Sequence, residues 1–186
     1  MFSHTINADV KLRLLEIRHA DELFRLADQN RVYLREWLPW VDSTTASVQT
    51  EGYIRSSLKA FSENNGFSAG IFYRGSMAGC IGLHAIDWAN RQTSIGYWLA
   101  ANYRGMGIMT SACRALIDYI FYDLSLNRVE IRAAALNAKS RAIPERMKFR
   151  NEGTVRQAQW LNGHYIDLVI YAMLKEDWTS DIVQSG

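Results

Sequence analysis

Residues 95–110 decide the fold, and they read Ile95-Gly96-Tyr97-Trp98-Leu99-Ala100-Ala101-Asn102-Tyr103-Arg104-Gly105-Met106-Gly107-Ile108-Met109-Thr110. The pattern predicts a strand that runs into a glycine turn, which becomes the first turn of a helix. A helix N-terminus presents unpaired N–H groups and a partial positive charge, so this arrangement suits a phosphate or pyrophosphate. Gly105 and Gly107 lack Cβ atoms and let an anion approach the backbone. The stretch is neither a P-loop nor a dinucleotide fingerprint. A surface turn whose glycines serve conformation alone is the alternative.

A second motif, Asn137-Ala138-Lys139-Ser140, follows a predicted strand at 128–136 and opens a helix. Asn is a good helix N-cap, and capping alone would explain it. The functional interpretation is that Asn137 and Ser140 face a ligand between this strand and the preceding one. Pro144 inside the helix removes one backbone hydrogen bond and should bend the helix.

Hydrophobic periodicity predicts the remaining elements. Strands are expected at 9–14, 67–73, 77–86, 92–100, 128–136, 154–160 and 165–174, and helices at 18–29, 32–38, 48–61, from the glycine loop to about 124, and at 138–149. Composition does not break along the chain, so we expect one mixed α/β domain over residues 1–186, with an ordered core at about 8–178. From Thr179 on there is no apolar period, and we expect the end to fray.

Composition and charge exclude several classes of protein. The 186 residues are 48% hydrophobic and 22% charged, which excludes a disordered or collagen-like chain. With 21 Lys+Arg against 19 Asp+Glu, the net charge of +2 indicates no nucleic-acid partner. The sequence shows neither a secretory leader nor an apolar run long enough to span a membrane. Cys80 and Cys113, both among apolar neighbours, favour a reducing, cytoplasmic location, and with the four scattered histidines they predict no metal site.

The two motifs, in this order, resemble those of the GCN5-related N-acetyltransferases (GNAT superfamily). That signature is Arg/Gln-x-x-Gly-x-Gly/Ala, followed after the next strand by Asn-x-x-Ser. The chain supplies Arg104 and Gly107, with Met109 where Gly or Ala is commoner, and then Asn137 and Ser140. Segments 95–99, 127–130, 140–146 and 161–163 are similar to the Rim-type branch, which acetylates the N-terminal amine of ribosomal proteins. The resemblance covers residues 8–178.

The resemblance implies a central, mostly antiparallel seven-stranded sheet that is flanked by helices and splayed between strands four (92–100) and five (128–136). It implies acetyl-CoA as the cosubstrate, lying in the V between these strands. Asn137 would hold the pantetheine arm, and Ser140 would donate a proton or hydrogen bond to the departing thiolate during direct acyl transfer. Backbone groups near Trp98 and Leu99 would pair with pantetheine and those of 104–109 with pyrophosphate. The residues implied to bind the cosubstrate are Trp98, Leu99, Arg104, Gly105, Met106, Gly107, Ile108, Met109 and Asn137.

The general base is not given by the motif. Many relatives have a Glu two residues before the Gly-Tyr pair, where this chain has Ser94. An α-amino group titrates at about 7.7–8.0, so little base strength is required. Water relayed to Asp167, His84 or Glu130 could serve, and Asp167 ranks first because an unpaired carboxylate inside an apolar strand is costly. A structural salt bridge for Asp167 and a satisfied hairpin-end histidine for His84 stay open. The cysteine and glutamate of some Rim-type enzymes correspond to Ala133 and Gln159.

Aromatic residues are candidates for the acceptor wall. Trp37 and Trp40, near the second helix, and His84 are the expected acceptor-binding residues, with Trp88 beside a hairpin. Core packing is the alternative for the tryptophans. Rim-type relatives commonly pair, so we expect a homodimer through the aromatic residues of the closing strands. These are Trp160, Tyr165 and Tyr171.

Three functions stay open on the sequence. The first is acetyl-CoA-dependent N-acetylation of a protein N-terminus, which the resemblance implies to be that of a ribosomal protein. The second is acetylation of a small amine such as a polyamine, an amino acid or an aminoglycoside. The third is a non-catalytic CoA-binding interaction module, which Ser94 in place of Glu keeps in view. The sequence shows no acidic cluster of the kind a polyamine needs, which favours the peptide acceptor.

Overall fold

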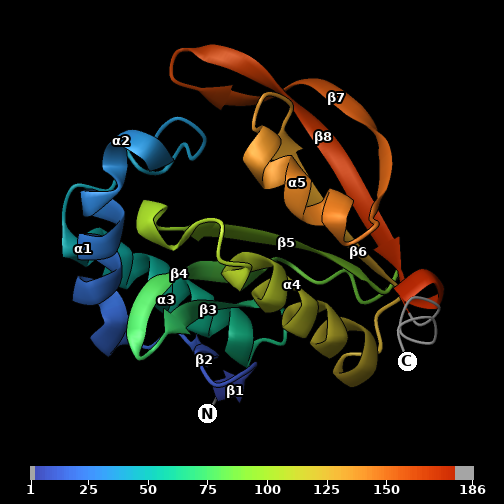
Figure 1. Cartoon of the computed structure of the whole chain (residues 1–186), viewed down its shortest axis with the longest axis horizontal. Coiled ribbons are helices and arrows are strands. Elements are labelled where there is room, and N and C mark those ends of the chain that lie inside the picture. Colours follow the sequence, from blue (N-terminus) through green and yellow to red (C-terminus); the bar gives the residue numbers. More distant parts are fainter. Residues whose placement is uncertain (1–2, 179–186) are drawn as a thin grey trace.

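The computed structural model describes residues 3–178. Eight strands form one sheet in the order β1-β2-β3-β4-β5-β6-β8-β7 (Figure 1). Neighbouring strands are antiparallel apart from β5 and β6, which are parallel. The strands are β1 (Ser3–Thr5), β2 (Val10–Leu14), β3 (Phe67–Tyr73), β4 (Ser76–Leu83), β5 (Gln92–Leu99), β6 (Arg128–Ala134), β7 (Arg150–Leu161) and β8 (His164–Leu174). The mixed α/β, mostly antiparallel fold is confirmed, but the predicted count of seven strands was one short, because three-residue β1 is too short to show alternation.

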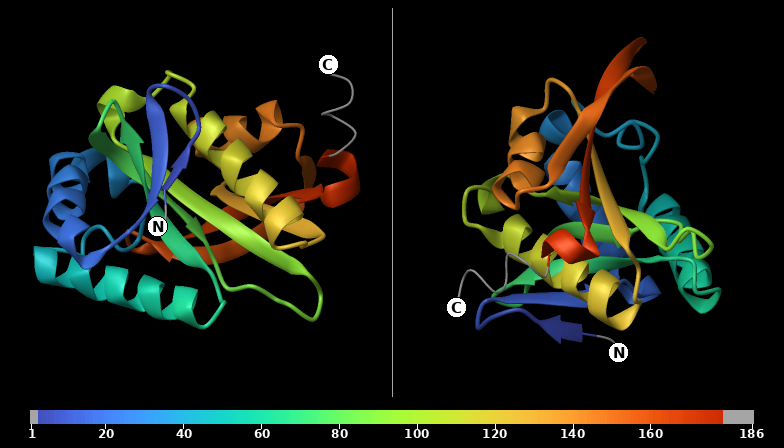
Figure 2. Two further views of the ribbon diagram at one scale, coloured as in Figure 1. Left: turned by 90° about the horizontal axis from the view of Figure 1, so that it is seen from below. Right: turned by 90° about the vertical axis from the view of Figure 1, so that its right-hand side faces the viewer.

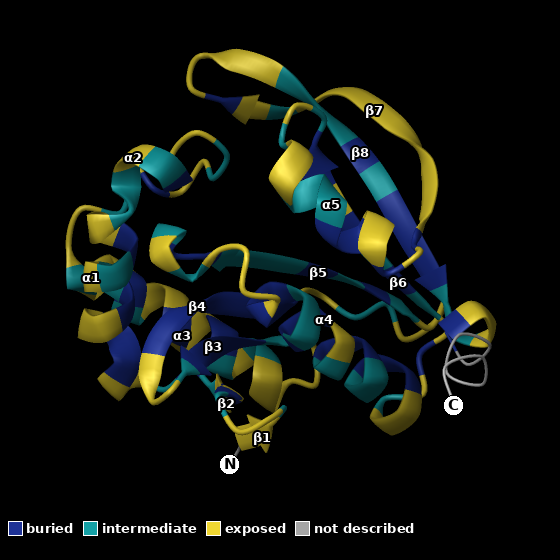
Figure 3. Cartoon of the chain, viewed as in Figure 1, coloured by how far each residue is buried: buried dark blue, intermediate teal, exposed yellow. Residues whose placement is uncertain are grey.

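Helices cover both faces of the sheet (Figures 1 and 2). They are α1 (Ala20–Gln29), α2 (Arg31–Leu34), α3 (Ser47–Ser62), α4 (Ile108–Asp118) and α5 (Ala138–Arg146). On one face, Cys80 of β4 packs with Leu23 of α1 and Ile54 of α3. The next residue, Ile81, belongs to the larger core cluster on the opposite face, which includes Ile117 of α4. Because successive strand residues point to opposite faces, β4 is buried on both, as Figure 3 shows for the centre of the sheet.

β5 and β6 separate partway along their length. They pair from Gln92↔Arg128 to Ile95↔Ile131 and no further. β5 nevertheless continues along β4 as far as Leu99, and β6 continues along β8 as far as Ala134. The predicted splay between these two strands is therefore confirmed, and it leaves a V that opens toward their carboxyl ends (Figure 1).

Several elements end earlier than the periodicity predicts. The helix expected to continue to about residue 124 is α-helical only to Asp118, and its last turn, Tyr119–Asp123, is π-helical. The helix expected at 32–38 ends as α2 at Leu34, and the chain then turns before Pro39. The helix expected at 138–149 ends at Arg146, because Lys148 has a φ of 61° and turns the chain into β7. Strand β4 ends at Leu83, three residues early.

Among residues 3–178, no helix is long and apolar enough to cross a membrane. The fraying predicted from Thr179 on lies outside the described residues.

Candidate active site

A cleft of about 1330 Å³ occupies the V between β5 and β6. Its lining includes Tyr97 and Leu99 from β5, and Ile131 and Ala133 from β6. The glycine loop and the first turn of α4 also contribute to the wall, as do the start of α5 and the segment after α2. The cleft thus joins both motifs that the sequence singled out.

The glycine loop ends in an unobstructed helix N-terminus. Gly105 and Gly107 have φ values of 76° and 74°, which L side chains rarely adopt, and no other group lies within 4 Å of where their Cβ atoms would be. Gly107 is the N-cap of α4 and supplies no side-chain cap, so the first N–H groups of α4 remain for a ligand. Two glycines, open space and unpaired N–H groups fit a phosphate group.

Two contacts hold the side chain of Arg104 beside the glycine loop. The Arg104 guanidinium stacks on the Tyr33 ring, 4.2 Å from its centroid, and its Nε donates to the Ala101 carbonyl at 3.1 Å. Met109 is buried in the core and also belongs to the cleft lining, whereas Met106 is 49% exposed and lies outside the lining. Tyr33 was not among the predicted site residues, and its position a few residues before Trp37 was the one signal that could have pointed to it.

The second motif caps α5 and also lines the cleft. Asn137 Oδ1 accepts the Ser140 backbone N–H at 3.0 Å, so the capping interpretation is correct. Both side chains also lie on the cleft wall. Pro144, inside α5, cannot donate to the Ser140 carbonyl four residues earlier. That carbonyl instead accepts the Tyr97 hydroxyl at 3.2 Å, a contact that ties α5 to β5 across the V.

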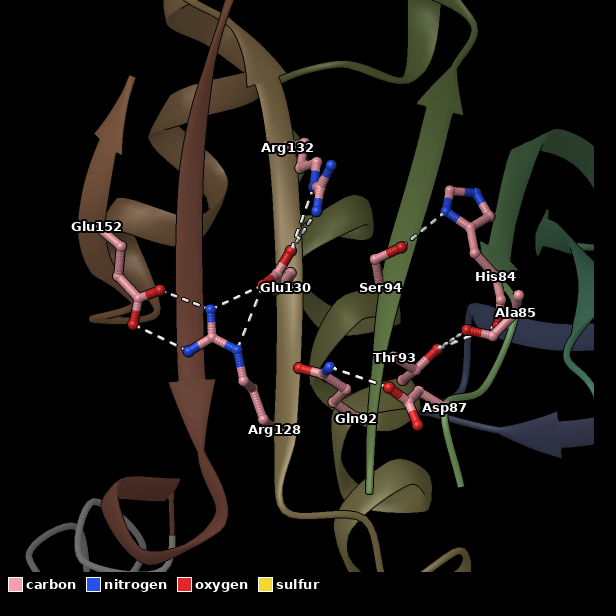
Figure 4. A network of polar contacts seen from close by, with 10 residues as sticks. All are labelled: His84, Ala85, Asp87, Gln92, Thr93, Ser94, Arg128, Glu130, Arg132 and Glu152. Carbon is pink, nitrogen blue, oxygen red and sulfur yellow. Dashed lines mark hydrogen bonds and ion pairs between the residues drawn. The ribbon is translucent and has the colours of Figure 1, made fainter. Parts of the chain in front are cut away.

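His84 is at the end of β4 and lines the cleft. Its Nδ1 lies 3.1 Å from the Ser94 hydroxyl, in the neighbouring strand β5 (Figure 4). Burial lowers the pKa of His84 below its usual 6.5. The imidazole is therefore mostly neutral at pH 7.

Glu130 is held by arginines and is not part of the cleft lining. It pairs with Arg128 at 2.7 Å and with Arg132 at 3.0 Å, and Arg128 also pairs with Glu152 (Figure 4). Burial raises the pKa of Glu130, but the hydrogen bonds from both arginines outweigh it and lower the pKa overall. A carboxylate so stabilised is a weak proton acceptor.

Asp167, ranked first as the base, is not among the described residues that line the cleft. Its Oδ1 accepts the backbone N–H of Gln157 at 2.7 Å. Gln157 has a φ of 50° and lies in the irregular part of β7, between Val155 and Gln159. The carboxylate therefore satisfies a backbone N–H in the part of β7 that does not pair with β8. This contact lies outside the cleft lining, so the geometry gives no support to the prediction of Asp167 as the base.

The predicted aromatic residues divide between the cleft and the surface. Trp37 and Trp40 line the cleft, and the Trp40 ring packs 6.0 Å from that of Trp98. Trp88 lies outside the lining and donates to the Asn64 carbonyl. Of the three residues expected at a dimer interface, Tyr171 was wrong, because it is 1% exposed and its hydroxyl donates to Glu145. The others, Trp160 and Tyr165, are exposed and in ring contact.

The charge of the cleft was not visible in the overall composition. Among the described residues of its lining, no side chain is acidic, and the charged ones are Arg104, Arg132, Lys139 and Arg146. Ala133 and Gln159, which correspond to a cysteine and a glutamate in some relatives, are also in the lining, and neither can act as a base. Within residues 3–178 no group of His, Cys, Asp and Glu could hold a metal ion.

The chain is similar to known acetyltransferases. Residues 9–150 match the family model of the acetyltransferase (GNAT) domain. A protein of Bacillus subtilis (strain 168) named "Putative ribosomal N-acetyltransferase YdaF" is 42% identical over 182 residues, which are 97% of this chain and 100% of that protein.

Two solved structures share the fold and about the same extent. The ribosomal L7/L12 alpha-N-protein acetyltransferase RimL, in complex with coenzyme A, is 28% identical with a TM-score of 0.89, over 93% of this chain and 98% of that one. The microcin C7 self-immunity acetyltransferase MccE, in complex with acetyl-CoA and AMP, is 30% identical with a TM-score of 0.87, over 91% and 94%. The chain therefore belongs to the GNAT family and is an acyltransferase, and its similarity extends to the Rim-type members of the family.

Proposed function

We propose that this protein transfers the acetyl group of acetyl-CoA to the N-terminal α-amine of a protein. The observation that carries the proposal is the cleft between β5 and β6, which joins an open helix N-terminus to an aromatic wall and whose described lining holds no acidic side chain.

The loop side of the cleft fits acetyl-CoA. Gly105, Gly107 and the first N–H groups of α4 would hold the pyrophosphate, with Arg104, Lys139 and Arg146 as nearby cations. The backbone edge of β5 at Trp98 and Leu99, which lies beyond the last pair with β6, would take the pantetheine amides. RimL with coenzyme A and MccE with acetyl-CoA are related structures that hold such ligands. Bound there, the thioester supplies an activated acetyl group.

Two residues of the second motif would act at the sulfur end. Asn137 is fixed because its Oδ1 accepts the Ser140 backbone N–H, which leaves its amide N–H groups to donate to a ligand in the cleft that it lines. The Ser140 hydroxyl lies on the same wall and would donate a hydrogen bond to the thiolate as it leaves. Most of the rate would come from holding donor and amine together.

The acceptor side favours a peptide over a polyamine. A polyamine carries several positive charges and requires acidic partners, whereas the charged side chains of the described lining are all basic. Trp37, Trp40 and Trp98 instead offer an apolar wall for an uncharged peptide backbone and a small first side chain. The names of YdaF and RimL, which refer to ribosomal proteins, point to the same class of acceptor.

Thiol release from acetyl-CoA tests the proposal. Peptides with a free N-terminal Ser or Ala should give acceptor-dependent release, while the same peptides blocked by N-terminal acetylation should give only the background rate. Turnover with spermidine and none with peptides would replace the protein acceptor by a small amine. Tight CoA binding without turnover on any amine would favour the non-catalytic module.

A further inference from the structure

We propose that His84 is the proton acceptor for the incoming amine, held in place by Ser94 and Gly96. The inference rests on the proposed function and names the base that the family motif leaves open.

The position of the imidazole is fixed by β5. Nδ1 lies 3.1 Å from the Ser94 hydroxyl, and the His84 backbone N–H donates to the Ser94 carbonyl at 2.9 Å. The Thr93 hydroxyl donates to the His84 carbonyl at 3.0 Å. A side-chain partner and two backbone contacts thus orient the ring on the strand that borders the V (Figure 4).

Gly96 leaves the space that one edge of the imidazole ring occupies beside β5. A Cβ at this position would lie 2.8 Å from Cε1 and 2.9 Å from Nε2 of His84, closer than real Cβ contacts permit. The Cε1–Nε2 edge of the ring therefore faces Gly96, one residue beyond the last β5–β6 pair at Ile95↔Ile131. This is the closed end of the V, opposite the pyrophosphate loop. Within the described part of the chain, Nδ1 is the ring nitrogen with a hydrogen-bond partner, so Nε2 remains for the substrate.

Other titratable groups near the closed end of the V are less suited than His84 to exchange a proton near neutral pH. Neighbouring Cys80 and burial raise the pKa of Tyr53 from α3, and burial raises that of Cys80 to about 12, so both stay protonated. On β6, Glu130 is neutralised by Arg128 and Arg132. The lowered pKa keeps the imidazole neutral. In the tautomer in which Nδ1–H donates to the Ser94 hydroxyl oxygen, Nε2 carries the lone pair that accepts the proton.

His84 would carry the amine's proton during acyl transfer. The amine nitrogen attacks the acetyl carbon, the C–N bond forms, and the C–S bond breaks with its electron pair staying on sulfur. The amine's proton passes to Nε2, directly or through one water, and the imidazolium returns it through water to the thiolate. The products are the amide and the free thiol, with His84 neutral again.

Kinetics against pH test the role of His84, with an N-terminal Ser peptide as acceptor. His84→Gln should lower kcat by about 100-fold or more near pH 7 with little change in KM for acetyl-CoA. Its kcat should rise with pH as the amine deprotonates at about 7.7–8.0, so the deficit should shrink at high pH. Ser94→Ala, which loosens the ring, should show a smaller loss. His4→Gln is the matched control, because His4 is exposed on β1 and outside the cleft lining.

A second readout does not depend on turnover. The side-chain NMR signals of His84 should titrate below pH 6.5, and Gly96→Ala, which displaces the ring, should shift that titration while CoA still binds. A His84→Gln enzyme with wild-type kcat and pH profile would overturn the assignment. If the wild-type enzyme acetylates no peptide while its His84 titrates as expected, the acceptor proposal is what fails.

Discussion

Single residues set the backbone conformation on which ligand binding depends. Gly107 caps α4 at a φ of 74°, and Gly75 turns the chain between β3 and β4 at a φ of 87°; neither has a neighbour within 4 Å of its missing Cβ. The two glycines are therefore alike in conformation and surroundings, but only Gly107 lies in the cleft.

Gly107→Ala should weaken CoA binding, measured by isothermal titration calorimetry, by about tenfold, because Ala in the left-handed region costs about 1–2 kcal/mol. Gly75→Ala is the matched control: it should lower the free energy of unfolding by a similar amount and leave the dissociation constant for CoA unchanged. Equal CoA affinity in Gly107→Ala and wild type would remove the loop from the ligand site.

The backbone conformation of single residues could be predicted from the sequence, whereas the partners of individual side chains could not. The glycine turn is a local property, so it could be foreseen at Gly105 and Gly107. The partner of Asp167 could not, because it depends on an irregular stretch of β7 around Gln157 that leaves no signal in the hydrophobic pattern. The same holds for His84, whose ring position depends on Ser94 and Gly96 of another strand.

Among the elements, the short helix Ile17–His19 connects β2 to α1, and a histidine side chain accepts a hydrogen bond at its start. His19 Nδ1 accepts the Glu16 backbone N–H at 3.0 Å, which requires that nitrogen to be unprotonated. Burial is the main cause that lowers the pKa of His19. Between its usual 6.5 and the lower folded value, the unfolded chain binds more protons, so stability is complete above 6.5 and falls as the pH drops through this window.

We expect His19→Gln to lose less stability than wild type between about pH 7 and pH 5, although it starts lower because a hydrogen bond is gone. Urea unfolding midpoints at the two pH values measure this, with His4→Gln as the control that keeps the wild-type pH response. An equal loss in His19→Gln and wild type would contradict this role for His19.

Strands and hairpins were predictable because alternation and turn residues are local signals. The hairpin across Asn162-Gly163 is present between β7 and β8. Element ends were not predictable when tertiary contacts set them. One tertiary contact does have a signal in the sequence. Pro144 leaves the Ser140 carbonyl without its helical donor, and the Tyr97 hydroxyl donates to that carbonyl instead.

At the scale of the whole molecule, the splay of β5 from β6 organises the enzyme. Alternating residues predict both strands, but their divergence came from the family resemblance and not from the pattern, and their parallel pairing was not predicted. That the chain is one domain stays a prediction, supported by the single sheet that runs from β1 to β7.

The β7–β8 hairpin carries the expected dimer contact. Trp160 and Tyr165 are 57% and 59% exposed, with ring centroids 4.8 Å apart (Figure 3 marks the hairpin's exposed stretches). We expect a dimer that covers this pair, measured by light scattering, and Trp160→Glu should yield monomers by placing a charge in the contact. Trp88→Glu, at an exposed tryptophan elsewhere, should remain dimeric. A monomeric wild-type protein would contradict the prediction.

The site of acetyl transfer distinguishes a protein's α-amine from the other possible acceptors. A peptide with a free N-terminal Ser and one internal Lys is incubated with the enzyme and acetyl-CoA, and the product is fragmented in a mass spectrometer. We expect one acetyl group on the N-terminal residue and none on the lysine. Acetyl on the lysine alone, or transfer to spermidine while the peptide stays unmodified, would contradict it.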